Sequence, residues 1–288
     1  SPQTPVDVNQ VRPADIAYIA ALGDSITTGV ISFNLAEEYD GILESFSGNS
    51  FDMGGDGRME THLTLPNILR HLNPKLVGFS RGRQGAYQNS VLNVAVGGRS
   101  SNDLPRQARE LVERFKKYPA SSVQSDWKLI HIFIGTNDIW GLCTTNNGTT
   151  KEAYKNFVRE AIVIIQQNLP RSIISLIGTF TSVPRALAEL AAEPAHQTKD
   201  QTVVVQNVFD NLYEPLRKAD GAYDVNFYAF DVFHLSKYGN SLVAKQLWKQ
   251  LLQPIGNKTT TNDEMADGSD MLACPDEVYT CTRSLVYN

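Results

Sequence analysis

This chain of 288 residues has few cysteines, no excess of basic residues and no long apolar run. Three cysteines are too few for a disulfide framework, and none forms a CxxC pair or lies near histidine at zinc-ligand spacing, so we expect no metal site. Lysine and arginine number 26 against 31 acids and are scattered, which argues against nucleic acid as a partner. No apolar run approaches the roughly 18 to 20 residues that cross a bilayer, so the sequence predicts no membrane span.

The composition is that of an ordinary globular protein, with 42% hydrophobic and 20% charged residues. The length lies near the upper end of what one hydrophobic core serves, so we expect a single domain over residues 1–288. The chain has no signal-peptide pattern and begins at Ser1 rather than at methionine. We therefore expect that a leader was removed or that the chain was excised from a longer one.

Short apolar runs rich in Ile and Val alternate with longer amphipathic stretches, a pattern typical of a parallel sheet covered by helices on both faces. This alternation predicts an α/β fold. The predicted strands lie near residues 16–22, 91–95, 129–134, 172–178 and 226–230. The predicted helices lie around residues 103–117, 151–168, 202–219 and 239–252.

Two segments interrupt or follow this alternation. Residues 30–90 form a long insertion rich in Gly, Ser, Asn and aromatic residues, with one helix-like patch at THLTLPNILRHL. A connection this long inside a compact domain is usually either functional or mobile. Residues 254–288 are polar and rich in threonine, and we expect them to form an extended C-terminal wrap rather than a second domain.

The first candidate for chemistry is Ser25, in Gly23-Asp24-Ser25 directly after an apolar run. A serine at the carboxyl end of a parallel strand is displayed at the edge where open α/β sheets bind ligands, and Gly23 permits a tight turn there. Taken alone, Ser25 is better interpreted as a helix cap. A catalytic role requires partners elsewhere in the chain.

Asp231 and His234, in the stretch DVFH, supply those partners. Histidine can accept the proton of a serine near neutral pH if a carboxylate holds its ring. Gly98, in NVAVGGR, and Asn137, in GTND, follow two other predicted strands. The backbone amides of Ser25 and Gly98 and the side-chain amide of Asn137 could bind the oxyanion that acyl transfer creates. Four such elements at strand ends are hard to explain as ordinary turns.

GDSI, the glycine of NVAVGGR, GTND and DVFH, in that order, resemble the four sequence blocks of the SGNH or GDSL hydrolases. The resemblance implies a flavodoxin-like three-layer α/β/α sandwich with a central parallel sheet. It also implies that Ser25 is the nucleophile of a triad with Asp231 and His234, that Gly98 and Asn137 belong to the oxyanion hole, and that no cofactor is needed. Two positions depart from the usual pattern: Ile26 replaces leucine, and Ala95 stands where glycine is common.

Within that superfamily, GGDGRMETHLTLPNIL, DLPRQARELVERFK, DWKLIHIFIGTND and LACPDEVYT resemble the phospholipase B branch. The implied substrate is an acyl ester of a glycerophospholipid or lysophospholipid, with transient contact with a membrane surface. Trp140 and His62 are candidates for substrate contact, although aromatic residues of this kind usually pack in the core.

Three alternatives stay open. Gly78-Phe-Ser80-Arg-Gly82 matches the GxSxG nucleophile motif, but no strand and helix flank it, so we expect a loop there. A carbohydrate O-acetyl esterase or another small-ester esterase could use the same triad, because fold does not fix substrate. A catalytically inert binding module is the third, and it would be expected to have lost at least one catalytic residue.

Weaker signals point to the secretory pathway. Two glycosylation sequons begin at Asn147 and Asn257, both in polar, loop-like sequence. Cys274 and Cys281 flank a short loop and are close enough to pair, although a pair between Cys143 and Cys274 is nearly as plausible. Free thiols in a cytosolic protein are the competing interpretation.

Overall fold

Four parallel strands lie at the centre of the part of the chain that the computed structural model describes, which is residues 4–33, 44–83, 91–144, 149–179, 183–210, 216–218, 220–255 and 257–258. Their order in the sheet follows their order in the chain: β1 (Ile16–Gly23), β2 (Trp127–Phe133), β3 (Ser172–Ile177) and β4 (Gln201–Gln206). Nearly every strand residue is buried, as expected for a parallel sheet covered on both faces.

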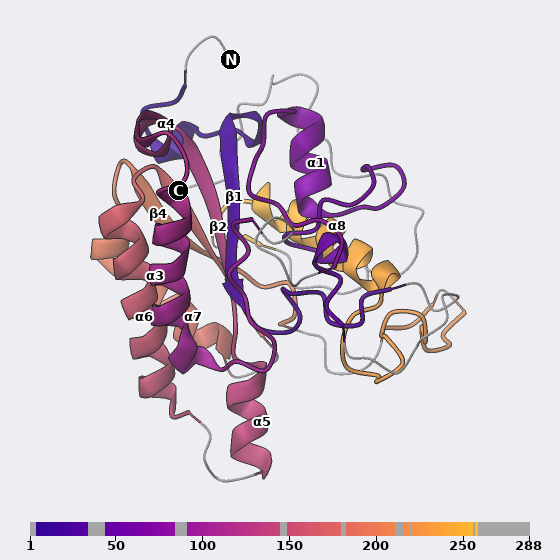
Figure 1. The fold of residues 1–288 in the computed structure, drawn as a ribbon. Coiled ribbons are helices and arrows are strands. Elements are labelled where there is room, and N and C mark those ends of the chain that lie inside the picture. The colour runs from indigo at the N-terminus through magenta and orange to yellow at the C-terminus, as the bar shows by residue number, and fades with distance from the viewer. Residues whose placement is uncertain are drawn as a thin grey trace.

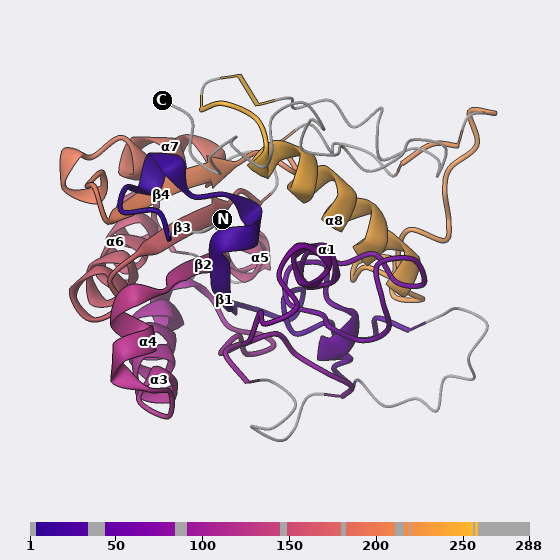
Figure 2. The same cartoon turned by 90° about the horizontal axis from the view of Figure 1, so that it is seen from above.

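Helices cover both faces of this sheet (Figures 1 and 2). One face packs against α3 (Leu104–Phe115), α4 (Ala120–Ser125), α6 (Lys151–Asn168) and α7 (Val183–Ala191). The opposite face packs against α1 (Leu65–Leu72) and α8 (Lys237–Leu251). The expected three-layer α/β/α sandwich is confirmed. Helix α5 (Thr136–Thr144) follows β2 and projects beyond the sheet (Figure 1).

Short 3-10 turns connect these elements, at Val8–Gln10, Pro13–Asp15, Ser47–Asn49, Ser101–Asp103 and Pro194–His196. Among the helices of the described residues, none is long and apolar enough to cross a membrane.

The long helix α6 shows how local sequence sets an element. Thr150 caps its first turn by accepting a hydrogen bond from the Ala153 amide, at 3.2 Å from Oγ1. Tyr154, Val158 and Ile162 recur every four residues and are buried against the sheet. The apolar stripe therefore fixes which face of α6 points inward.

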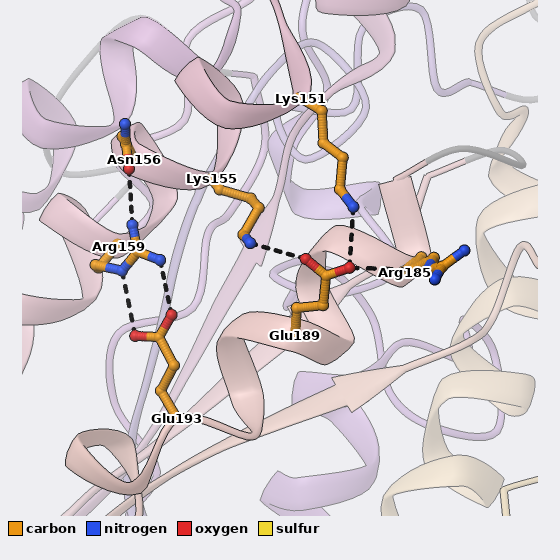
Figure 3. A network of polar contacts seen from close by, with 7 residues as sticks. All are labelled: Lys151, Lys155, Asn156, Arg159, Arg185, Glu189 and Glu193. Atoms are coloured by element: carbon orange, nitrogen blue, oxygen red, sulfur yellow. Dashed lines mark hydrogen bonds and ion pairs between the residues drawn. The ribbon is translucent and has the colours of Figure 1, made fainter.

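The outer surfaces of α6 and α7 are joined by ion pairs (Figure 3). Glu189 accepts from Lys151 and Lys155, at 2.9 and 2.8 Å, and Glu193 pairs with Arg159 at 2.7 Å. Hydrogen bonds from Lys155 and Lys151 lower the pKa of Glu189 to about 2. Because these pairs face water, they orient the helices more than they stabilise them.

Three sequence-based predictions of elements are wrong. The predicted helix over residues 202–219 fails at its start, because the β-branched run Val203–Val205 forms part of strand β4. The strand over 226–230 does not join the sheet, because Tyr228 bridges Leu235 and the chain folds back on itself. The strand over 91–95 is a single parallel bridge, Ala21 to Asn93, beside β1.

The described part of the insertion, residues 44–83, packs into the molecule rather than away from it. The Phe51 amide donates to Oδ1 of Asn240 in α8 at 2.8 Å, and Phe51 is fully buried. Helix α1, predicted as a helix-like patch, adds Leu65 and Leu69 to the same core. The insertion thus contributes to the core between the sheet and α8.

Candidate active site

The turn that carries Ser25 begins where β1 ends, at Gly23. A Cβ at Gly23 would lie 2.6 Å from the carbonyl oxygen of Phe133 and 2.8 Å from Oγ1 of Thr27, so only glycine lets the turn press against β2. The Gly23 amide donates to Oε1 of Gln107, and Nε2 of Gln107 donates back to the Gly23 carbonyl. These contacts fix the turn while Ser25 stays partly exposed.

Ser25, His234 and Asp231 form a continuous hydrogen-bonded chain. The Oγ atom of Ser25 lies 2.8 Å from Nε2 of His234, and Nδ1 of the same ring lies 2.6 Å from Oδ2 of Asp231. In this arrangement a serine has a base within reach and the base has an orienting carboxylate. The three residues expected from the sequence as a triad are therefore brought together.

The loop that carries Asp231 and His234 is built around the carboxylate. Oδ1 of Asp231 accepts from the amides of Phe233 and His234, at 3.1 and 3.0 Å. Partial burial pushes the pKa of Asp231 upward, but these bonds and the one from the His234 ring outweigh it and lower that pKa. Asp231 is thus held as a carboxylate, the state in which it stabilises an imidazolium.

Gly98 and Asn137 lie beside each other in the region expected to bind an oxyanion. Gly98 has a φ of 74°, and Nδ2 of Asn137 donates to the carbonyl of the next residue, Arg99, at 2.9 Å. Among the described residues, no acceptor is found for the backbone amides of Ser25 and Gly98. A Cβ at Gly97 would lie only 3.9 Å from Cβ of Ser25, which places this segment against the serine.

Buried carboxylates surround the serine turn, and the sequence-based reasoning did not find them. Asp24 is buried and accepts from the Ile26 amide at 3.0 Å, and buried Asp138 accepts from the amide and hydroxyl of Ser101. Burial raises the pKa of Asp24 to about 7 and that of Asp52 to about 6. Asp24 and Asp138 belong to the GDSI and GTND blocks, so their place in those motifs was the available signal.

No hydrogen bond joins the other predicted site residues to Ser25 among the described residues. His62 is buried, and Trp140 in α5 is 66% exposed. The rival serine, Ser80, is fully buried, and its Oγ accepts from Nδ2 of Asn93 at 3.2 Å, so it is not displayed on a nucleophile turn. In the described part of the chain, no three acidic, His or Cys side chains are placed to hold a metal ion.

The modification sites expected from the sequence fall mostly outside the described residues. Asn147, Cys274 and Cys281 lie in segments that the structure does not describe. Asn257 is described and exposed, as an attached sugar would require.

Comparison with known proteins gives one family and several relatives. A family model described as GDSL-like Lipase/Acylhydrolase matches residues 19–247. The proteins named "Phospholipase B1, membrane-associated" from Homo sapiens and Mus musculus are 33% and 31% identical to this chain over 96% of its residues. The chain spans about a fifth of their length, 21% in each case.

Two solved structures are also similar. One is a psychrotrophic esterase from Pseudoalteromonas sp., with a TM-score of 0.43 and 12% identity, covering 79% of this chain and 92% of that one. The other is an acetyl xylan esterase from Geobacillus stearothermophilus, with a TM-score of 0.42 and 17% identity, covering 79% and 91%. The family model spans most of the chain, including Ser25 and His234. The chain belongs to the GDSL-like lipase/acylhydrolase family.

Proposed function

We propose that this chain is a single catalytic domain that hydrolyses acyl esters of glycerophospholipids or lysophospholipids. The observation that carries the proposal is the hydrogen-bonded chain from Oγ of Ser25 through the His234 ring to Asp231. Similarity to phospholipase B1 over almost the whole chain supports a phospholipid as the source of the acyl group.

The proposed reaction is a double displacement. Nε2 of His234 takes the proton of Ser25 while Oγ attacks the ester carbonyl, and the imidazolium then protonates the departing alcohol. Water, deprotonated by His234, hydrolyses the acyl-enzyme and releases the fatty acid with Ser25 restored. Asp231 stays ionised throughout and orients the ring.

Charge on the carbonyl oxygen must be met by donors that are already in place. We assign this role to the amides of Ser25 and Gly98 and to the side-chain amide of Asn137. Nδ2 of Asn137 carries two hydrogens, and the bond to the Arg99 carbonyl uses one of them. Donors held in this way cost no reorganisation when the charge develops.

Product analysis with two substrates tests the proposed substrate class. The protein would be incubated separately with lysophosphatidylcholine and with an acetylated sugar, and release of long-chain fatty acid would be compared with release of acetate. We expect fatty acid from the lysophospholipid. Acetate release without fatty acid release would replace the proposal with an O-acetyl esterase on the same fold.

A second experiment separates an enzyme from an inert binding module. A fluorophosphonate probe reacts with an activated serine, and peptide mapping locates the labelled residue. We expect the label on Ser25, with no label after His234→Ala. Absence of any label would support the binding module, and a label on Ser80 would refute the assigned nucleophile.

We further propose that the protein passes through the secretory pathway, carries sugar on Asn147 and Asn257, and pairs Cys274 with Cys281. The exposure of Asn257 supports the second sugar site. Peptide mapping of the natural protein under non-reducing conditions, with and without glycosidase treatment, tests all three. Unmodified asparagines together with free thiols would argue for a cytosolic protein.

A further inference from the structure

Exposed apolar side chains gather on the segment that carries His234. Eleven large hydrophobic residues are exposed among those described, and six of them fall within residues 223–238. We name these six the loop patch: Tyr223, Val225, Phe230, Val232, Phe233 and Tyr238. Such clustering differs from the scattered surface apolar residues of most proteins and marks a surface for contact.

Val232 is the most exposed member of the loop patch, at 73%, and it has a φ of 57°. A β-branched residue rarely adopts the left-handed region, so the backbone here is strained. Val232 follows Asp231 in the chain, and its apolar side chain faces solvent. Asparagine would fit that backbone with less strain.

Ring contacts connect the loop patch to the catalytic residues. The ring of Phe233 lies edge-on to the His234 ring, with centroids 4.9 Å apart. The Phe230 ring lies 6.4 Å from that of Phe33, which belongs to a small apolar cluster with Ile31 and, at its edge, Val30. The loop patch therefore adjoins the His234 ring, which is itself hydrogen-bonded to Ser25.

The charge of this segment selects among surfaces. Residues 223–238 carry one basic and two acidic side chains: Lys237, Asp224 and Asp231. The segment therefore has no basic excess. An anionic membrane surface would attract a basic segment, so an apolar segment without basic excess fits a zwitterionic surface better.

We propose that the loop patch docks onto the surface of a zwitterionic phospholipid aggregate and places the site at that surface. This inference rests on the proposed function and adds to it, because it names the physical state in which the substrate is met. Long-chain phospholipids in water exist almost entirely in aggregates, so a site that takes them benefits from a surface anchor beside its entrance.

Direct binding tests this inference without relying on turnover. Sedimentation with phosphatidylcholine vesicles would be measured in a Ser25→Ala background, for the loop patch as it stands and for Val225→Ser and Val232→Asn combined. Burying a valine in lipid is favourable by enough that the double change is expected to weaken vesicle partitioning by about tenfold or more. Val6→Ser, at a valine that is 57% exposed in the N-terminal segment, is the matched control and is expected to change partitioning by less than about twofold.

Activity on a water-soluble monomeric ester, measured with Ser25 intact, separates docking from catalysis. We expect the Val225→Ser and Val232→Asn protein to hydrolyse it within about twofold of the unchanged rate. Equal loss of vesicle binding in the Val6→Ser control, or no vesicle binding by any form, would overturn the inference. If the double change abolished self-association of the protein and left vesicle binding unchanged, the loop patch would be assigned to contact with a second copy of the chain. Vesicle binding without release of fatty acid would instead contradict the proposed function and leave the docking surface standing.

Discussion

The Thr27 hydroxyl donates a hydrogen bond to Oδ2 of Asp52, at 3.1 Å, and so joins the serine turn to the insertion. Oδ1 of the same carboxylate accepts from the Ser50 hydroxyl at 2.5 Å. The carbonyl of Thr27 accepts from Nδ2 of Asn93, in the segment that leads to Gly98. A single buried threonine thus connects the turn that carries Ser25, the insertion and the segment that leads to Gly98.

Thr27→Val tests this connection. The replacement keeps the shape of the side chain but leaves the buried Asp52 carboxylate with one donor fewer, so we expect the free energy of unfolding to fall by about 1–3 kcal/mol. Urea denaturation measures it. Thr4→Val, at an exposed threonine of the N-terminal segment, is the control and is expected to change stability by less than about 0.5 kcal/mol. Equal effects of the two changes would contradict a special role for Thr27.

The raised pKa of Asp52 predicts a pH-dependent stability difference. In the folded state this pKa is about 6, against an ordinary 3.8, so between those values the folded state binds more protons than the unfolded state. Stability contributed by Asp52 therefore falls as pH rises through that window, by up to about 3 kcal/mol.

Asp52→Asn removes this titration, and urea midpoints at pH 5 and pH 8 measure the consequence. The free energy of unfolding of the variant, minus that of the unchanged protein, should therefore be more positive at pH 8 than at pH 5. Comparing the two proteins at each pH cancels the contributions of His62 and His131, whose pKa values burial lowers and which act in the opposite direction. Asp24 does not cancel fully, because the Asp52 charge contributes to its raised pKa, but the remainder has the same sign as the expected difference. A stability difference that is constant from pH 5 to pH 8 would refute a raised pKa for Asp52.

Asp231→Asn is expected to lower kcat by about three to four orders of magnitude. An amide oxygen can still accept from the Phe233 and His234 amides, so the loop should keep its shape, but the ring loses the carboxylate that orients it and stabilises its charged form. Steady-state kinetics on a soluble ester, alongside a thermal unfolding curve, separate the two effects. Activity within tenfold of the unchanged enzyme would exclude the carboxylate from the triad.

Gly97→Ala should discriminate between acyl chains. The added methyl group would lie 3.9 Å from Cβ of Ser25 and 3.9 Å from Cγ2 of Val30, which is ordinary contact, so folding should be retained. It would nevertheless occupy space directly beside the nucleophile. We expect kcat/KM for a long-chain ester to fall at least about tenfold more than for an acetate ester. Equal losses on both esters would show that acyl chains do not pass this residue.

Ser25→Ala is expected to abolish turnover, with a loss of about three to six orders of magnitude and an unchanged unfolding midpoint. The change removes one partly buried hydroxyl and its hydrogen bond to His234 but leaves the surrounding core in place. Hydrolysis of lysophosphatidylcholine, followed by titration of released fatty acid, provides the measurement. Substantial residual hydrolysis would require another nucleophile.

Regular apolar periodicity made much of the fold predictable. Strands β1, β2 and β3 are short, buried runs rich in Ile and Leu, and α6 has a buried stripe on one face. The prediction failed at β4, where the polar residues Gln201 and Gln206 bound the valine run and obscured the strand. It also missed α7, which follows β3 in the chain.

The candidate site was predictable where its residues lie in short motifs. Asp231 and His234 are three residues apart, so a single turn brings them together, and the motif preserves that geometry. Asp52 could not be found in this way, because its contact with Thr27 crosses 25 positions of the chain and depends on how the insertion folds. Long-range contacts of that kind leave no local pattern in one sequence.

The hydrogen bond between Ser25 and His234 spans 209 positions, from the end of the first strand to the start of the last helix. Closing such a span is entropically costly, so we expect the pair to form late, once the layers between the two residues have assembled. Under the proposed function, ester hydrolysis would then report completed folding. During refolding, regain of turnover should coincide with the slowest spectroscopic phase, and any intermediate in which α8 has not yet docked should be inactive.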